Sequence, residues 1–132
     1  MKEAPFETIA SLSDQTHDIA DVRIKTVVFA KCPISGWFFN HWGLILERED
    51  GRYVTVQFVK SGCEIDRAGS LEHAKEPISR CSNANVENVQ TMSLGKPNRC
   101  STVGQIINAA SQFEREYSFF SYNCRHFVLD VL

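Results

Sequence analysis

Two strands and the turn that joins them are encoded by residues 41–59, HWGLILEREDGRYVTVQFV. Apolar and polar or small residues alternate in both halves, as they do in half-buried β-strands. We therefore predict one strand over residues 41–47 and another over 52–59. Glu49-Asp50-Gly51 lies between them, and three-residue hairpin loops commonly place a glycine in the left-handed conformation at this point.

The length of this loop decides which side chains share a face. A three-residue loop pairs Arg48 with Arg52 and Gly43 with Gln57, so that His41 lies diagonal to Gln57 on the same face. A two-residue turn over Asp50-Gly51 would shift the register by one and move Gln57 to the opposite face. The sequence is compatible with both turns, and we favour the three-residue loop.

Other elements are predicted on both sides of the hairpin. A strand over residues 22–30 and a loop over 31–36 precede it, and a loop-rich stretch over 60–84 follows. Within that stretch Ser70 is expected to cap a short helix, Leu71 to Glu76, that Pro77 ends. A strand over 88–94 and a helix over 102–116 with Ser101 as its cap come next. The apolar face of that helix is expected to comprise Val103, Ile106, Ile107, Ala110 and Phe113. The pattern predicts an α+β fold, with an antiparallel β-sheet packed against helices.

Composition limits the class of protein. The chain has 132 residues, enough for a single domain over 1–132, with 43% hydrophobic and 23% charged residues and a net charge of −2. This charge gives no reason to expect nucleic acid as a partner. We see neither a signal peptide nor an apolar run long enough for a transmembrane segment. The five cysteines are odd in number and form no Cys-x-x-Cys pair, which favours a reducing, cytoplasmic location without disulfides or a zinc site. No metal ion or cofactor is predicted.

One of these cysteines is a candidate nucleophile. It lies in the stretch Asn123-Cys124-Arg125-His126-Phe127, in which Asn123 is a good helix N-cap and Cys124 is the first helical residue. The partial positive charge of a helix N-terminus favours thiolate over thiol. A free cysteine in such a helix is otherwise most often an inert core residue, so the functional interpretation requires a base.

His41 is the best candidate for that base. In a helix, His126 would point about 200° away from Cys124, because each residue turns the chain by about 100°. His17 and His73 lie in polar segments. A base also needs a third group that orients its ring, and Gln57 meets this need if the three-residue loop forms.

The two short motifs, His41-Trp42-Gly43 on a strand and residues 123–127 at the start of a late helix, resemble the lecithin:retinol acyltransferase family. That family belongs to the circularly permuted, papain-like cysteine hydrolases of the NlpC type, and the order of elements is similar over about residues 22–130. The resemblance implies a permuted papain-like (NlpC-type) fold, with Cys124 as nucleophile and His41 as base. It also implies a thioester whose acyl group passes to water, an alcohol or an amine.

Two residues depart from the family pattern. Arg125 replaces a glutamate beside the nucleophile, where a positive charge favours the thiolate. No histidine lies on the strand after the hairpin, and Gln57 is nearest to the place where the family has one. Trp42, Asn123 and Arg125 are expected to contact the substrate, which is an acyl-lipid or a peptide or other amide.

Two other functions remain open. The PPPDE-type deubiquitinating peptidases share a strand histidine and a later Asn-Cys pair, so the chain is alternatively a cysteine peptidase or isopeptidase. The substitution at residue 57 also suits a catalytically silent binding module on the same fold.

Overall fold

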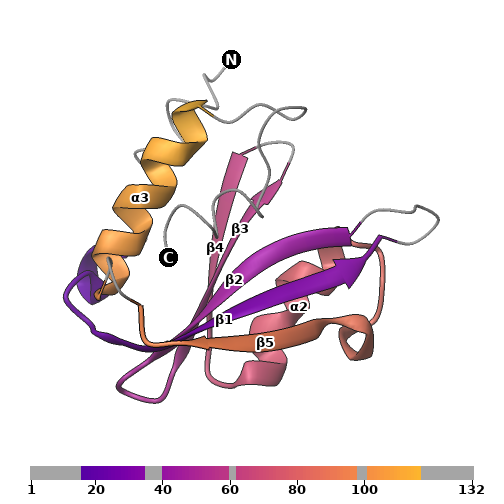
Figure 1. Cartoon of the computed structure of the whole chain (residues 1–132), viewed down its shortest axis with the longest axis horizontal. Helices are drawn as coiled ribbons and strands as arrows, with labels where there is room; N and C mark the ends of the chain where they lie inside the picture. Colours follow the sequence, from indigo (N-terminus) through magenta and orange to yellow (C-terminus); the bar gives the residue numbers. More distant parts are fainter. Residues whose placement is uncertain (1–15, 35–39, 60–61, 98–100, 117–132) are drawn as a thin grey trace.

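The computed structural model describes residues 16–34, 40–59, 62–97 and 101–116. Its centre is a five-stranded antiparallel sheet in the order β4-β3-β2-β1-β5 (Figure 1). The strands are β1 (Ile24–Pro33), β2 (Asn40–Arg48), β3 (Tyr53–Val59), β4 (Gly62–Ala68) and β5 (Gln90–Gly95). The helices are α2 (Leu71–Cys81) and α3 (Val103–Glu116), with short 3₁₀ turns η1 (His17–Ile19) and η2 (Val86–Asn88). The predicted α+β class, an antiparallel sheet packed against helices, is confirmed.

The central hairpin has the predicted three-residue loop. The backbone N–H of Gly51 donates to the carbonyl of Arg48 at 3.0 Å, and the N–H of Arg48 donates to the carbonyl of Arg52 at 2.8 Å. Gly51 has a φ of 86°, the left-handed conformation that glycine adopts without steric cost. Gly43 therefore pairs with Gln57, and the register of the two-residue turn is excluded.

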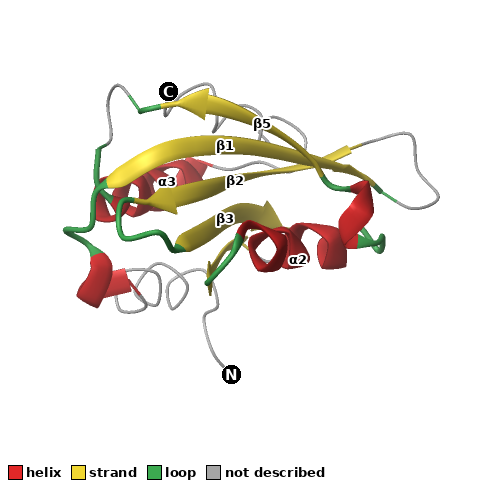
Figure 2. Ribbon diagram, turned by 90° about the horizontal axis from the view of Figure 1, so that it is seen from below, coloured by secondary structure: helices red, strands yellow, loops and turns green. Residues whose placement is uncertain are grey.

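The two helices cover opposite faces of the sheet, as Figures 1 and 2 show. The α3-side core is formed by alternate strand residues, such as Val27, Leu44 and Val56, together with the buried face of α3. The α2-side core is formed by the intervening strand residues together with Ala74 and Ile78 of α2. Because side chains alternate along a strand, the two central strands β1 and β2 contribute buried side chains to both cores.

The prediction for α3 is confirmed except at its cap. Val103, Ile106, Ile107 and Ala110 are buried as expected, whereas the side chain of Phe113 lies outside the described part. The cap is Thr102 rather than Ser101. Thr102 Oγ1 accepts from the backbone N–H of Gln105, and Gln105 Oε1 accepts from the backbone N–H of Thr102, both at 3.2 Å. This reciprocal pair is a capping box.

The predicted end of the earlier helix at Pro77 is wrong. A proline inside a helix removes one backbone hydrogen bond and costs about 3 kcal/mol. However, α2 continues to Cys81, because Ala74, Pro77 and Ile78 are all buried against the sheet. Burial of apolar side chains stabilises a helix more than local propensity does.

Two further boundaries also differ from the prediction. The loop predicted from residue 31 onward begins later, because β1 continues to Pro33. The pairing of β1 with β5 stops at Lys31, opposite Gln90 at the start of β5. At Pro33 strand β1 therefore has a neighbour on one side only, where a missing N–H costs least. Strand β4 lies within the stretch predicted to be loop-rich. It is an edge strand, and edge strands tolerate charged residues such as Glu64 and Arg67.

Candidate active site

His41 lies near the start of β2 and faces α2. It pairs with the buried Cys32 of β1, which belongs to the α2-side core. Its Nε2 atom lies 2.6 Å from Oε1 of Gln57. The predicted diagonal approach of these two side chains is therefore present. Gly43 lies between them in the register, and the space above it is filled by Ile78 of α2, which lies 3.0 Å from the position that a Cβ atom would take.

Gln57 is fully buried, with 0% of its surface exposed. Its Nε2 donates to Oε1 of Glu64 at 3.3 Å, so both ends of the amide have partners. Buried amides are nearly always bonded in this way, because an unsatisfied polar group costs free energy. Glu64, Gln57 and His41 thus form a continuous chain of hydrogen bonds across β4, β3 and β2.

The environment of His41 favours its neutral form. Burial lowers the pKa of His41 below its ordinary value of 6.5, while its hydrogen bond to Gln57 and the charge of Glu64 oppose this change. Burial penalises the charged imidazolium more than these two partners stabilise it. A neutral ring near pH 7 has a free lone pair and can accept a proton, as a general base must.

Cys81 lies at the C-terminal end of α2, close to the same chain of groups, and the sequence prediction did not single it out. Its thiol is exposed at the surface. Partial burial and the nearby Glu64 carboxylate raise the pKa of the Cys81 thiol, whereas Arg80 and the Gln57 amide lower it less. The thiolate is the reactive form of cysteine. This environment therefore disfavours Cys81 as a nucleophile.

Trp42 points to the other face of the sheet. It packs against the α3-side core, and its ring lies 4.4 Å from that of Phe29 between centroids, with 43° between the ring planes. The alternation of side chains along β2 separates it from His41. The structure therefore does not bring Trp42 together with His41, and its contact with a substrate stays a prediction.

The remaining predicted site residues, Asn123, Cys124 and Arg125, lie outside the described residues. Their approach to His41 stays a prediction. Of the described cysteines, Cys32 and Cys63 are buried and Cys81 is exposed. Within the described residues, no group of three or more His, Cys, Asp or Glu side chains is arranged to hold a metal ion.

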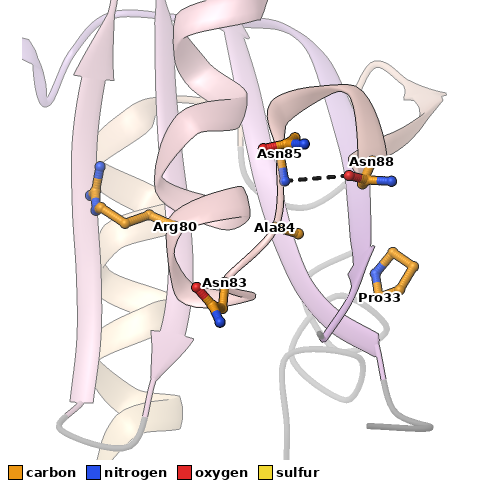
Figure 3. A pocket seen from close by; sticks show the side chains of 6 residues that line it. All are labelled: Pro33, Arg80, Asn83, Ala84, Asn85 and Asn88. Atoms are coloured by element: carbon orange, nitrogen blue, oxygen red, sulfur yellow. Dashed lines mark hydrogen bonds between the residues drawn. The ribbon is translucent and has the colours of Figure 1, made fainter. Parts of the chain in front are cut away.

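A polar hollow of about 540 Å³ lies at the C-terminal end of α2 (Figure 3). Its lining comprises Pro33, Arg80, Asn83, Ala84, Asn85 and Asn88. Figure 3 shows Asn85 and Asn88 side by side, where the backbone N–H of Asn85 donates to Oδ1 of Asn88 at 3.3 Å. Pro33 directly follows Cys32, the partner of His41 in the sheet. Amide and guanidinium groups can bind carboxylate, phosphate or amide groups of a ligand.

The fold and this site together define an α+β protein in which a strand histidine is held by a buried amide. No family model matches the chain, and no match was found among curated proteins or solved structures. Neither helix of the described part is long and apolar enough to cross a bilayer.

Proposed function

We propose that this chain is a cysteine-dependent acyl hydrolase or acyltransferase of the lecithin:retinol acyltransferase-like family, with the permuted papain-like (NlpC-type) fold that the resemblance implies. The observation that carries the proposal is the 2.6 Å contact between His41 Nε2 and Gln57 Oε1. A neutral imidazole whose second nitrogen is held by an amide is the base that a thiol nucleophile requires. In this proposal the nucleophile is Cys124.

The proposed reaction has two stages. His41 takes the proton of the Cys124 thiol, and the sulfur attacks the carbonyl carbon of the acyl donor. The resulting oxyanion is stabilised by the backbone N–H of Cys124, because the first N–H groups of a helix have no intrahelical partner. When the tetrahedral intermediate collapses, His41 returns the proton to the leaving group. Water, an alcohol or an amine then attacks the thioester, and His41 accepts its proton. The C–S bond breaks, and the Cys124 sulfur leaves and takes the proton back from His41.

The role of Gln57 is to orient the base. The silent-module alternative depends on the missing second histidine of the family. Gln57 accepts a hydrogen bond from His41 and is itself held by Glu64, which supports the catalytic proposal over the silent module. An amide stabilises an imidazolium less than a charged partner does. We therefore expect a working but modest catalyst.

Mass spectrometry after incubation with a p-nitrophenyl ester of a fatty acid tests this proposal. The expected result is one acyl adduct on Cys124 that is lost in Cys124→Ala and strongly reduced in His41→Gln. Cys81→Ser is the matched control, because Cys81 is an exposed thiol beside the same hydrogen-bonded chain. Equal labelling of Cys81 and Cys124 would show that the assignment is wrong.

A parallel assay separates the acyl and peptidase functions. The same protein is incubated with a peptide amide and with a ubiquitin-like isopeptide substrate. Cleavage of either substrate without ester turnover would favour the peptidase alternative. Ester turnover with transfer of the acyl group to added alcohol or amine would identify an acyltransferase.

A further inference from the structure

We infer that Glu64 is a positioning residue of this site, because its carboxylate sets the orientation of the Gln57 amide and thereby decides which ring nitrogen of His41 carries the proton. The catalytic consequence rests on the proposed function, whereas the effect on the ring does not. Glu64, Gln57 and His41 come from the neighbouring strands β4, β3 and β2.

The first step is the contact between Glu64 and Gln57. The two residues are directly paired in the β3–β4 register, and Gln57 Nε2 lies 3.3 Å from Glu64 Oε1. An ionised carboxylate has no hydrogen to donate, whereas the amide nitrogen has two. The NH₂ end of Gln57 must therefore face Glu64, and the oxygen end is left to face His41.

The second step is the contact between Gln57 and His41. Oε1 of Gln57 can only accept a hydrogen bond, so the N–H at the 2.6 Å contact must belong to His41 Nε2. A neutral imidazole carries one N–H. The lone pair is therefore on Nδ1, and Nδ1 is the atom that can take a proton from the nucleophile.

Without an acceptor at Glu64, the orientation of this amide would not be selected. The two ends of an amide are similar in size, and a flipped Gln57 would donate to Nε2 and move the ring proton to Nδ1. Gln57 is fully buried, so bulk water does not hold it in place. Cys81 is also close to the Gln57 amide. A thiol is both a weak donor and a weak acceptor, so it does not favour one orientation.

The test is the protonation pattern of the His41 ring, read from two-bond ¹H–¹⁵N NMR spectra of the full chain. We expect the neutral Nε2–H form in the wild type. Glu64→Gln preserves the shape but can both donate and accept, so we expect partial loss of this form and new Nδ1–H signals. Asp66→Asn is the matched control. It removes the same charge from the same strand, from a residue paired with Thr55 rather than Gln57, and should leave the spectrum unchanged.

Kinetics provide the second readout. With the same ester donor, Glu64→Gln is expected to lower the acylation rate by roughly tenfold to a hundredfold, the usual cost of losing an outer partner behind a functional histidine. Glu64→Asp retains a group that only accepts, and should restore the Nε2–H spectrum.

Two results would overturn the inference: a wild-type ring in the Nδ1–H form, which requires no variant, or an unchanged spectrum in folded Glu64→Gln. A shifted spectrum without any Cys124 adduct in the wild type would instead reject the proposed function and leave the role of Glu64 intact. A Cys124 adduct in the wild type together with an unchanged His41 spectrum in Glu64→Gln would support the proposed function and reject the role of Glu64.

Discussion

In the proposed function, Gln57 performs with an amide what the resemblance implies a histidine does in related chains. An amide does not titrate, so its hydrogen bond to His41 persists at any pH at which the ring carries the Nε2 proton. Its burial also isolates this bond from solvent. In a low-dielectric environment such bonds are stronger, and leaving one unmade costs more.

Replacement of Gln57 by leucine should damage both stability and activity. His41 and Glu64 would each lose a partner, at a cost of about 1–3 kcal/mol in the free energy of unfolding. The hydrogen bond to Gln57 raises the pKa of His41 against the effect of burial, so its loss should lower that pKa further. Acylation should slow by roughly tenfold or more, because the ring is no longer oriented.

Gln57→His is the informative control for this prediction, since it restores the residue that the resemblance implies. Gln57→His should retain most of the acylation activity that Gln57→Leu loses. An NMR titration of the His41 ring and the rate of Cys124 acylation measure both effects. An unchanged His41 titration in Gln57→Leu would contradict the role assigned to the amide.

The sequence predicts one part of this site and not the other. The contact between His41 and Gln57 follows from the three-residue loop that we favoured, because the loop length fixes the register, although the sequence is also compatible with a two-residue turn. Glu64 could not be found in this way, because its strand carries charged residues and lacks a clear apolar alternation. Cys81 was missed because the helix was predicted to end at Pro77. Burial of Ile78 against the sheet extends the helix to Cys81.

At the scale of elements, Ile78 of α2 packs directly over Gly43 of β2. A Cβ atom there would lie 3.0 Å from Cδ1 and 3.3 Å from Cγ1 of Ile78. Gly43→Val should therefore push α2 away from β2 and destabilise the protein by about 1–3 kcal/mol, the usual cost of overpacking. Urea denaturation measures this cost.

A double-mutant cycle with the smaller substitution Gly43→Ala can show that the cost of a side chain at residue 43 comes from its contact with Ile78. Ile78→Val removes Cδ1, the nearest atom, so Gly43→Ala should cost less in that background than in the wild type. Additive effects of the two substitutions would indicate that the close approach of α2 does not limit the size of residue 43.

At the start of α3, the direction of the stability change caused by Gly104→Ala is the prediction. In most helices Gly→Ala stabilises by about 1 kcal/mol. A Cβ at Gly104 would lie 2.8 Å from the backbone oxygen of Ala20, and that same oxygen accepts the N–H of Gly104 at 2.9 Å. Gly104→Ala should therefore lower the unfolding temperature. Gly69→Ala, which has nothing within 4 Å, is the control and should be neutral or slightly stabilising.

At the scale of the whole molecule, His41 and Asp18 link stability to pH at separate places. His41 lies between the sheet and α2, with its pKa lowered by burial. Asp18 connects η1 to β4 through two hydrogen bonds from Arg67, at 2.7 and 2.9 Å. These bonds lower the pKa of Asp18 from 3.8 to about 2. Both groups therefore bind a proton less readily in the folded chain than in the unfolded one.

This difference in proton binding determines how stability changes with pH. Where the unfolded chain binds more protons than the folded one, stability decreases as the pH falls. For His41 this window begins near its ordinary pKa of 6.5 and ends at the lower folded pKa. For Asp18 it extends from about pH 3.8 down to about 2. We therefore expect the free energy of unfolding to decline in two separate stages on acidification.

Two variants can show which residue produces each stage. The measurement is the free energy of unfolding, from urea denaturation at a series of pH values. His41→Gln can still donate to Gln57 but does not titrate, so it should flatten the first stage and leave the second. Asp18→Asn should weaken only the second. It should not remove that stage completely, because the pKa of Asp50 is also lowered: burial raises it, but hydrogen bonds from Arg48 and from the backbone of Arg52 lower it more. Since Asp18 is exposed, its stage should also weaken in high salt, whereas that of His41 should not. A first stage that persists in His41→Gln would show that another group produces it, and that the imidazole is not held neutral in the fold.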